Sequence, residues 1–277
     1  MSEKTTAAAT GASATEHFRA TVNGAADVPP ERVDALVNDV LQSVHATIRA
    51  HRVTYSEYDA LKAWLIQVGR DGEWPLFLDV FVEHVVEEVA TAGRAGSKGS
   101  IEGPFYVPGA PEFGADATLP MRDDEQGVRL TLHGQVRSVD GTPLPGAKVD
   151  IWQDDAAGFY SQFAQNIPEW NLRGVITADE NGRFRIRTIQ PTPYQIPIDG
   201  ATGALIRAAN WPAYRPAHLH LKVSAAAHQQ ITSQLYFPGD PHNETDIADA
   251  VKPELILQPT PAADGIDVEY DFILDPA

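Results

Sequence analysis

The chain has 277 residues, which is enough for one large or two smaller domains with a sizeable core. Its 38 acidic and 21 basic residues give a net charge of −17, which argues against nucleic acid or an anionic membrane as a partner, because both need a basic surface. Cysteine is absent, so disulfides, thiolate nucleophiles, iron–sulfur clusters and Cys-ligated zinc are excluded.

The first 14 residues are rich in Ala, Thr and Ser, a composition that predicts a disordered tail at residues 1–14. The N-terminal stretch MSEKTTAAATGASATEHFRA has neither the basic start nor the apolar centre of a secretory signal. No apolar run reaches the ~18 residues that a membrane-spanning helix needs. We therefore expect a cytoplasmic protein that does not enter a membrane.

Residues 29–93 have the pattern of helices. The pair Pro29–Pro30 suits a helix start, and the apolar residues that follow recur with the helical period. These residues are Val33, Leu36, Val37, Val40, Leu41, Val44 and Ile48. Further on, Thr54 and Glu57 have the spacing of a capping box, which predicts the start of a second helix.

The stretch EWPLFLDVFVEHVVEEVA (73–90) predicts a single third helix that starts at Pro75. It is apolar on more than one side, as expected for a helix packed between neighbours. The Gly and Pro residues of TAGRAGSKGSIEGPFYVPGAP (91–111) then end the helical pattern and mark a linker or a surface loop. These boundaries predict a helical domain at 15–98 and a second domain at 99–277.

From residue 128 the apolar period becomes two. In GVRLTLHGQVRSVDG (127–141), Val128, Leu130 and Leu132 share one face, and Asp140-Gly141 has the composition of a hairpin turn. Similar stretches are AKVDIWQDD (147–155), GRFRIRTI (182–189), AHLHLKVSA (217–225), SQLYFPG (233–239) and VEYDFILD (268–275). Many short strands with Gly/Pro turns predict an antiparallel β-sandwich, so the expected fold is mainly β with an N-terminal all-α domain.

The strand-like stretch RPAHLHLKV (215–223) places two histidines on one face. His218 and His220 are two residues apart, and side chains at that spacing leave the same side of a strand. Imidazole binds Zn, Cu, Fe or Ni, and a site completed by one of the many carboxylates stays open. The alternative is a pair of histidines on a hydrated sheet face.

Two tyrosines lie in turns rather than in strand interiors. Tyr160 follows a Gly in DDAAGFYSQF (154–163), and Tyr194 lies between prolines in IQPTPYQIPIDGATG (189–203). Taken alone, each is explained most simply by a ring that packs and a hydroxyl that bonds a backbone carbonyl.

Together these stretches resemble the intradiol ring-cleaving dioxygenases. The resemblance runs from the helical part almost to the C-terminus, and the order Tyr, Tyr, His-x-His with these flanks is more specific than any of its parts. The segments that carry it are GSIEGPFYVPGAP (99–111), GFYSQF (158–163), PEWNLRGVITADENGRFRIRT (168–188), PYQIPIDGATG (193–203), RPAHLHLKVSA (215–225) and TSQLYFPGD (232–240).

The resemblance implies a mononuclear non-haem Fe(III) centre. Carried over position by position, its protein ligands are Tyr160, Tyr194, His218 and His220. Phenolate is a hard anionic donor, and a trivalent cation would deprotonate a tyrosine whose ordinary pKa is about 10. The implied reaction is cleavage of catechol by O2 to cis,cis-muconate, in the β-ketoadipate route of aromatic catabolism.

The same resemblance assigns further roles. Arg215 matches the position that stabilises the electron-rich ring, Tyr194 is expected to accept a substrate proton, and Gln234 matches a residue that holds the ligands and substrate. The residues that match the apolar pocket walls are Ile101, Pro104, Phe105, Ile247 and Ala248. Walls so poor in polar groups favour an unsubstituted or small-alkyl catechol over a hydroxylated or carboxylated ring.

By the same resemblance, the helices of residues 15–98 would join two subunits into a homodimer and enclose a phospholipid at the interface. Other functions stay open. Within the same class these are chlorocatechol and hydroxyquinol 1,2-dioxygenases. Outside it they are a non-catalytic β-sandwich binding module, with or without Zn on the histidines, and an Fe(II) site completed by a carboxylate.

Overall fold

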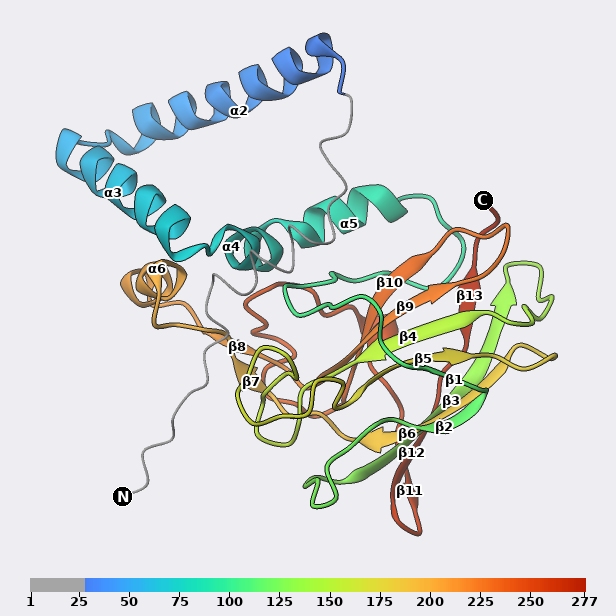
Figure 1. Cartoon of the computed structure of the whole chain (residues 1–277). Helices are drawn as coiled ribbons and strands as arrows, with labels where there is room; N and C mark the ends of the chain where they lie inside the picture. Colours follow the sequence, from blue (N-terminus) through green and yellow to red (C-terminus); the bar gives the residue numbers. More distant parts are fainter. Residues whose placement is uncertain (1–27) are drawn as a thin grey trace, which may run out of the picture.

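The computed structural model describes residues 28–277, in which four helices precede a sandwich of two β-sheets (Figure 1). The tail predicted at residues 1–14, and the first part of the predicted helical domain at residues 15–27, lie outside the described residues. Within residues 28–277, no helix combines the length and the apolar character needed to cross a membrane.

The first two described helices begin where the sequence predicts. Helix α2 (Pro30–His51) starts at the proline pair, and α3 (Tyr55–Asp71) has the predicted capping box. Thr54 Oγ1 accepts the Glu57 N–H at 3.3 Å, and the Glu57 carboxylate accepts the Thr54 N–H at 2.7 Å. An N-cap of this kind contributes about 1 kcal/mol. Helix α2 extends away from the sandwich, and none of its residues is buried (Figure 1).

The prediction of one helix over residues 73–90 is wrong, because two short helices occupy this stretch. Helix α4 (Trp74–Phe81) and helix α5 (Glu83–Thr91) are separated by Val82, whose φ is −130° and ψ −34°. No Gly or Pro marks this point in the sequence. The first residue of α5 accepts hydrogen bonds from the backbone N–H groups of Glu102 at 2.6 Å and Gly103 at 3.1 Å. The break therefore accompanies a tertiary contact, which local periodicity does not reveal.

The sandwich consists of two sheets and a small separate pair. The first sheet has the order β1 (Glu112–Phe113), β5 (Arg173–Thr177), β4 (Lys148–Trp152), β9 (His218–Ser224), β10 (Ile231–Tyr236). The second has the order β11 (Thr260–Ala262), β12 (Gly265–Glu269), β3 (Arg129–Ser138), β6 (Arg183–Ile189), β2 (Asp116–Thr118), and β13 (Phe272–Leu274) also pairs with β3. Strands β7 (Tyr194–Gln195) and β8 (Tyr214–Arg215) pair with each other.

The predicted antiparallel pairing is confirmed at the centre of each sheet, where β4 pairs with β5 and β9, and β3 pairs with β6. Strands β1, β2 and β13 instead join their neighbours in parallel, and β12 is parallel to β3 but antiparallel to β11. The stretch VEYDFILD, predicted as one strand, is divided between β12 and β13, and β5 was not predicted. Strand direction depends on long connections, which alternation within a strand does not encode.

The main core lies between the two sheets. Alternate residues of the strands point into it, and its fully buried members include Leu132, Ile151, Ile176, Ile186 and Leu221. Full burial of such side chains contributes about 1.5–3 kcal/mol each. This rigid core leaves the connecting loops and the strand ends free to carry a site.

A helix that was not predicted, α6 (Ala201–Ala209), links the helical part to the loop that carries Tyr194. The buried Glu73 carboxylate accepts the Thr202 N–H at 2.7 Å, and Trp64 Nε1 donates to the Ala201 carbonyl at 2.8 Å. A nine-residue helix is marginal in isolation. Side chains of distant helices thus stabilise its first turn.

Candidate metal centre

One cross-strand row of the first sheet underlies the site. Arg173 on β5, Trp152 on β4, His220 on β9 and Gln234 on β10 are successive register partners. Register partners on neighbouring strands direct their side chains to the same face. All four residues are at most 1% exposed, so the row forms a buried floor of polar and aromatic groups.

Three donor atoms of the predicted ligands converge above this floor. His218 Nε2 lies 2.9 Å from His220 Nε2, and Tyr160 Oη lies 3.1 Å from His220 Nε2 and 3.5 Å from His218 Nε2. Metal bonds to nitrogen and oxygen are about 2.0–2.2 Å long, so ligand atoms on adjacent positions of one ion are about 3 Å apart. The observed separations therefore suit a single shared ion.

The fourth predicted ligand, Tyr194, comes from β7 and joins the same group. A side-chain hydrogen bond links it to Tyr160, and its ring centroid lies 5.7 Å from those of Tyr160 and His218. Gly158 allows the close approach of the two tyrosine segments. Its φ is +85°, and a Cβ at this position would lie 3.0 Å from the Tyr194 Cβ.

Burial sets the protonation state of the four side chains. Desolvation, assisted by the charge of Arg215, lowers the pKa of His218 to about 3, and desolvation lowers the pKa of His220 well below its usual range. Desolvation also raises the pKa of Tyr160 well above its usual range and that of Tyr194 to about 12. The imidazoles are thus neutral, as metal ligands must be, whereas the phenols need a nearby cation to ionise.

Contacts beyond the donor atoms orient both imidazoles. His218 Nδ1 donates to the Pro216 carbonyl at 2.7 Å, which leaves the Nε2 lone pair directed at the donor group. The His220 ring stacks on Trp152, with centroids 4.8 Å apart and planes 12° from parallel. Each ring is therefore held by a contact that does not involve its Nε2 atom.

Gln234 joins the ligands to the surrounding groups. Its amide nitrogen donates to the Ile101 carbonyl at 2.8 Å and lies 3.2 Å from His220 Nδ1. Its amide oxygen accepts hydrogen bonds from Arg215 Nη2 at 2.9 Å and from the Tyr236 hydroxyl at 2.7 Å. One fully buried side chain thus contacts an imidazole, a guanidinium and the loop that starts at residue 99.

Arg215 is a buried cation whose guanidinium contacts the imidazole of His218. Its Nη1 lies 3.3 Å from His218 Nε2, and Asp246 accepts from its Nε and Nη2, each at 3.0 Å. Desolvation acts to raise the pKa of Asp246, but the charge and hydrogen bonds of Arg215 outweigh it and lower that pKa. Sequence reasoning missed Asp246, and only its position next to the predicted wall residue Ile247 pointed to it.

The predicted wall residue Phe105 packs directly on the tyrosines. Its ring stacks on Tyr160, with centroids 4.5 Å apart and an interplanar angle of 17°. It also meets Tyr194 edge to face at 6.2 Å. An apolar ring thus packs against both tyrosines of the donor group.

The other predicted wall residues lie nearby in two groups. Ile101 and Ala248 are buried in one small apolar cluster, and Ile247 packs against the cluster that contains Phe105 and the two tyrosines. Pro104 is half-buried beside Phe105. The structure therefore packs Phe105 and Ile247 with the two tyrosines, whereas Ile101 and Ala248 lie in a separate small cluster.

The loop at residues 99–105 is anchored by α5. Glu83 accepts the N–H groups of Glu102 and Gly103, and Lys252 donates to the Gly99 carbonyl at 2.7 Å while it also pairs with Glu87. Close to this anchor, desolvation and then the charges of Glu83 and Glu102 raise the pKa of Asp79 to about 8. Acidic side chains of the helical part thus hold the apolar lid in place.

A carboxylate-completed site is not supported. In the part of the chain that the structure describes, no group of three or more His, Asp or Glu side chains is arranged to hold a metal ion. The Asp246 carboxylate is occupied by Arg215. The oxygen atom within 3.5 Å of both imidazole Nε2 atoms is instead the Tyr160 hydroxyl.

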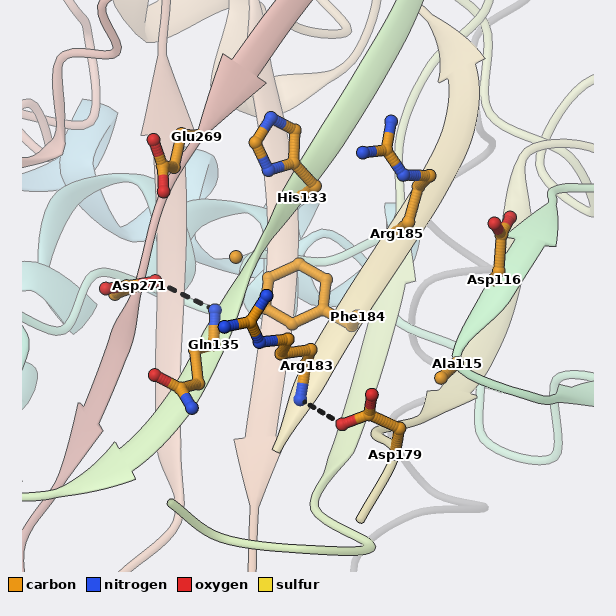
Figure 2. Close-up of a pocket in the computed structure, with 11 residues that line it drawn as sticks. Ala115, Asp116, His133, Gln135, Asp179, Arg183, Phe184, Arg185, Glu269 and Asp271 are labelled. Atoms are coloured by element: carbon orange, nitrogen blue, oxygen red, sulfur yellow. Dashed lines mark hydrogen bonds between the residues drawn. The ribbon is translucent and has the colours of Figure 1, made fainter. Parts of the chain in front are cut away.

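A pocket of about 330 Å³ lies elsewhere, on the face of β2, β3, β6 and β12 that points away from the core. Figure 2 shows His133 and Arg185 side by side there, with Glu269 and Asp116 at either end of the same cross-strand row. None of the predicted ligands lines this pocket. It is a charged sheet face that is separate from the donor group.

Comparisons with known proteins show the family to which the chain belongs. The family model described as "Catechol dioxygenase N terminus" matches residues 30–98, and the one described as "Dioxygenase" matches residues 101–276. The chain is 39% identical over 252 residues to a chlorocatechol 1,2-dioxygenase of Rhodococcus opacus, covering 88% of this chain and 97% of that protein.

Two further similarities extend this result. A catechol 1,2-dioxygenase of Acinetobacter baylyi is 36% identical, with 82% of this chain and 76% of that protein covered. Among solved structures, 3-chlorocatechol 1,2-dioxygenase from Rhodococcus opacus superposes with a TM-score of 0.86 at 45% identity, over 90% of this chain and 100% of that one.

Proposed function

Because this chain belongs to the intradiol ring-cleaving dioxygenase family, we propose that it cleaves catechol with O2 between the two hydroxylated carbons, giving cis,cis-muconate. The observation that carries the proposal is the convergence of Tyr160 Oη, His218 Nε2 and His220 Nε2 within 3.5 Å, with Tyr194 bonded to the first. All four side chains are buried, and the apolar Phe105 ring stacks on Tyr160.

The four side chains would hold Fe(III). Two neutral imidazoles and two phenols suit a ferric ion, because phenolate is a hard anionic donor and imidazole is a common iron ligand. When bound, the ion would withdraw electron density from a catecholate ring and make that ring reactive toward O2. The protein's contribution is to orient the donors and to exclude water, and the buried floor and the Phe105 lid support both roles.

Two of the chain's own groups would act on the substrate. Tyr194 Oη is proposed to accept a proton from an incoming catechol hydroxyl. The Arg215 guanidinium, 3.3 Å from His218 Nε2, is proposed to stabilise negative charge as it builds on the ring carbons. Asp246 and Gln234 hold Arg215 in a fixed orientation, so this stabilisation needs little reorganisation during the reaction.

A chlorocatechol is the second candidate substrate. Two chlorocatechol dioxygenases among the relatives favour it: one is 39% identical in the sequence comparison, and the other is 45% identical in the comparison with solved structures. The apolar walls at Ile101, Phe105 and Ile247 accept a hydrogen or a chlorine atom equally well on polarity grounds. A third hydroxyl, as in hydroxyquinol, would be desolvated against these side chains at a cost of about 1–3 kcal/mol.

Turnover of catechol, 3-chlorocatechol, 4-chlorocatechol and hydroxyquinol under one set of conditions tests the proposal. We expect the highest kcat/KM with catechol, or with a chlorocatechol if the second candidate is right. Preferential cleavage of hydroxyquinol would overturn the substrate assignment. A colourless protein with full zinc occupancy and no turnover would overturn the enzymatic proposal and favour a binding module.

We also propose that a second copy of the chain covers helix α2. Its apolar stripe is exposed along the whole helix, including Val37, Val40 and Val44, and such a stripe is unfavourable in water for an isolated subunit. A homodimer through the helical part would bury it, with room for a phospholipid as a further prediction. The expected cytoplasmic location also remains a prediction.

A further inference from the structure

Arg173 on β5 is a buried cation whose guanidinium forms no direct ion pair within residues 28–277. Its residue exposure is 1%, and no Asp or Glu of residues 28–277 forms an ion pair with it. Arg215, which is equally enclosed, differs because Asp246 pairs with it through both oxygens. An unpaired buried charge is costly, so the contacts of Arg173 should reveal what compensates it.

The hydrogen bonds and the ring contact of the Arg173 side chain all lead to the turn that carries Tyr160. Its Nε donates to Ser161 Oγ at 2.7 Å, and its Nη2 donates to the Ser161 carbonyl at 3.1 Å. Its guanidinium carbon lies 5.9 Å from the centre of the Phe163 ring. Nη1 has no hydrogen-bond partner. Arg173 therefore holds the residues directly after Tyr160 and has donor capacity left over.

The neighbouring groups that could compensate the charge are few. Desolvation lowers the pKa of Arg173 to about 10. Electrostatic interactions with Tyr160, Asp150 and Tyr106, the largest of them with Tyr160, act to raise the pKa. Arg173 is therefore still charged at neutral pH. Asp150 already accepts a hydrogen bond from the Tyr106 hydroxyl at 3.0 Å. Tyr160 is thus the neighbour that would gain a negative charge on binding a cation.

We propose that Arg173 is a positioning residue of the iron site, which fixes the Tyr160 turn through Ser161 and balances the charge of Tyr160 as a phenolate ligand. This inference rests on the proposed function, since Tyr160 is anionic only as a ligand. The cross-strand row gives Arg173 its place, because it is the register partner of Trp152, which supports His220. One row of the sheet would then serve both kinds of ligand.

The proposal has a spectroscopic consequence. A positive charge near a phenolate holds its electrons more tightly, so electron transfer from tyrosinate to Fe(III) requires more energy. Removal of that charge should move the tyrosinate-to-iron absorption band to longer wavelength. It should also make the Fe(III)/Fe(II) midpoint potential more negative, because the ferric state then has one positive neighbour fewer. A purely structural role predicts neither change.

The experiment compares full-length, iron-loaded wild type with Arg173→Met, Arg173→Gln, Arg173→Lys and Ser161→Ala. We expect both neutral variants to show the longer-wavelength band, a more negative potential and roughly 10–100-fold weaker retention of iron against a chelator. Arg173→Lys should restore the band and potential, and Ser161→Ala should keep them, since both retain the charge. Arg185→Met, on the exposed face of the second sheet, is the matched control.

Each outcome decides the question. A folded, iron-loaded Arg173→Met or Arg173→Gln protein with the wild-type band and potential would overturn the proposal. Failure of both neutral variants to fold would also overturn it, because Arg173 would then serve the fold rather than the iron site. A wild-type protein that binds iron without a tyrosinate band would instead overturn the proposed function.

Discussion

Asp246 binds Arg215 with both carboxylate oxygens, at 3.0 Å each, in a pair that is almost fully buried. The same carboxylate accepts the backbone N–H groups of Ala248 and Ala250, each at 3.2 Å. The orientation of the guanidinium and the position of the wall at residues 247–250 are therefore set by one side chain. A change at Asp246 should affect both.

Asp246→Asn should lower kcat and reduce stability together. It leaves a buried guanidinium without its counter-charge, and breaking such pairs costs about 3–5 kcal/mol. Urea unfolding and steady-state kinetics of the variant provide the measurement. Glu244→Gln, at an exposed position two residues away, is the control. Wild-type kcat in Asp246→Asn would show that Arg215 needs no fixed orientation.

Tyr160→Phe should weaken and shift the visible absorption and abolish most of the activity, because it removes one of the two proposed phenolate ligands. Iron content and the absorption spectrum of the purified variant measure this directly. Tyr55→Phe, at a position 87% exposed on α3, should remain coloured and active. An unchanged spectrum in Tyr160→Phe would contradict the ligand assignment.

Stability should fall as pH rises toward 9, in part through Asp79. Desolvation raises its pKa to about 8 in the folded protein, whereas an unfolded Asp titrates near 4. The folded state therefore binds the extra proton, so this contribution is complete below about pH 4 and is lost as pH rises through 8. The loss can reach about 1.4 kcal/mol per pH unit between these values.

Thermal unfolding from pH 5 to pH 9 tests this expectation. Asp79→Asn should have a flatter stability profile and should exceed the wild type in melting temperature at pH 9. Asp264→Asn, at an exposed position, should follow the wild-type profile. Parallel profiles for Asp79→Asn and wild type would mean that Asp79 is ionised in the folded protein.

Glu83→Gln should raise KM more than it lowers kcat. The amide can accept from one of the Glu102 and Gly103 N–H groups but not from both, so the lid loop loses one hydrogen bond. Such a bond contributes about 0.5–1.5 kcal/mol, which corresponds to a rise in KM of roughly 2- to 12-fold. Glu88→Gln, on the exposed side of α5, is the control. Equal KM values in the two variants would remove Glu83 from lid positioning.

Val40→Asp should dissociate the proposed dimer. Val40 is 61% exposed near the middle of α2, and a carboxylate there would be buried without a partner on association. Light scattering coupled to gel filtration gives the mass of the particle. Asn38→Asp, which also adds a negative charge to α2, is the comparison. A monomeric wild type would contradict the dimer proposal before any variant is made.

Local sequence patterns predicted the features that residues close together in the chain determine. The capping box at Thr54 is present, and alternation placed His218 and His220 on one strand face, where their Nε2 atoms are 2.9 Å apart. The resemblance supplied Tyr160 and Tyr194, which alternation could not, because Tyr160 lies outside any strand and Tyr194 lies in a strand of only two residues.

The features that were missed all depend on contacts between distant parts of the chain. The helix break at Val82 accompanies hydrogen bonds between Glu83 and a loop about 20 residues further on. Asp246 is 31 residues from Arg215, and the segment around it has the composition of an ordinary acidic loop. Arg173 lies in a strand that alternation did not reveal. Only the structure shows that its guanidinium is buried without a direct ion pair within the described residues.

The row formed by Arg173, Trp152, His220 and Gln234 has a consequence for the assembly of the enzyme. Its members come from four different strands, spread over more than 80 positions of the chain. A partly ordered chain that lacks any one strand also lacks the floor of the site. Iron capture would thus be confined to the last stage of maturation, and the onset of colour during refolding would time the moment when the sheet closes.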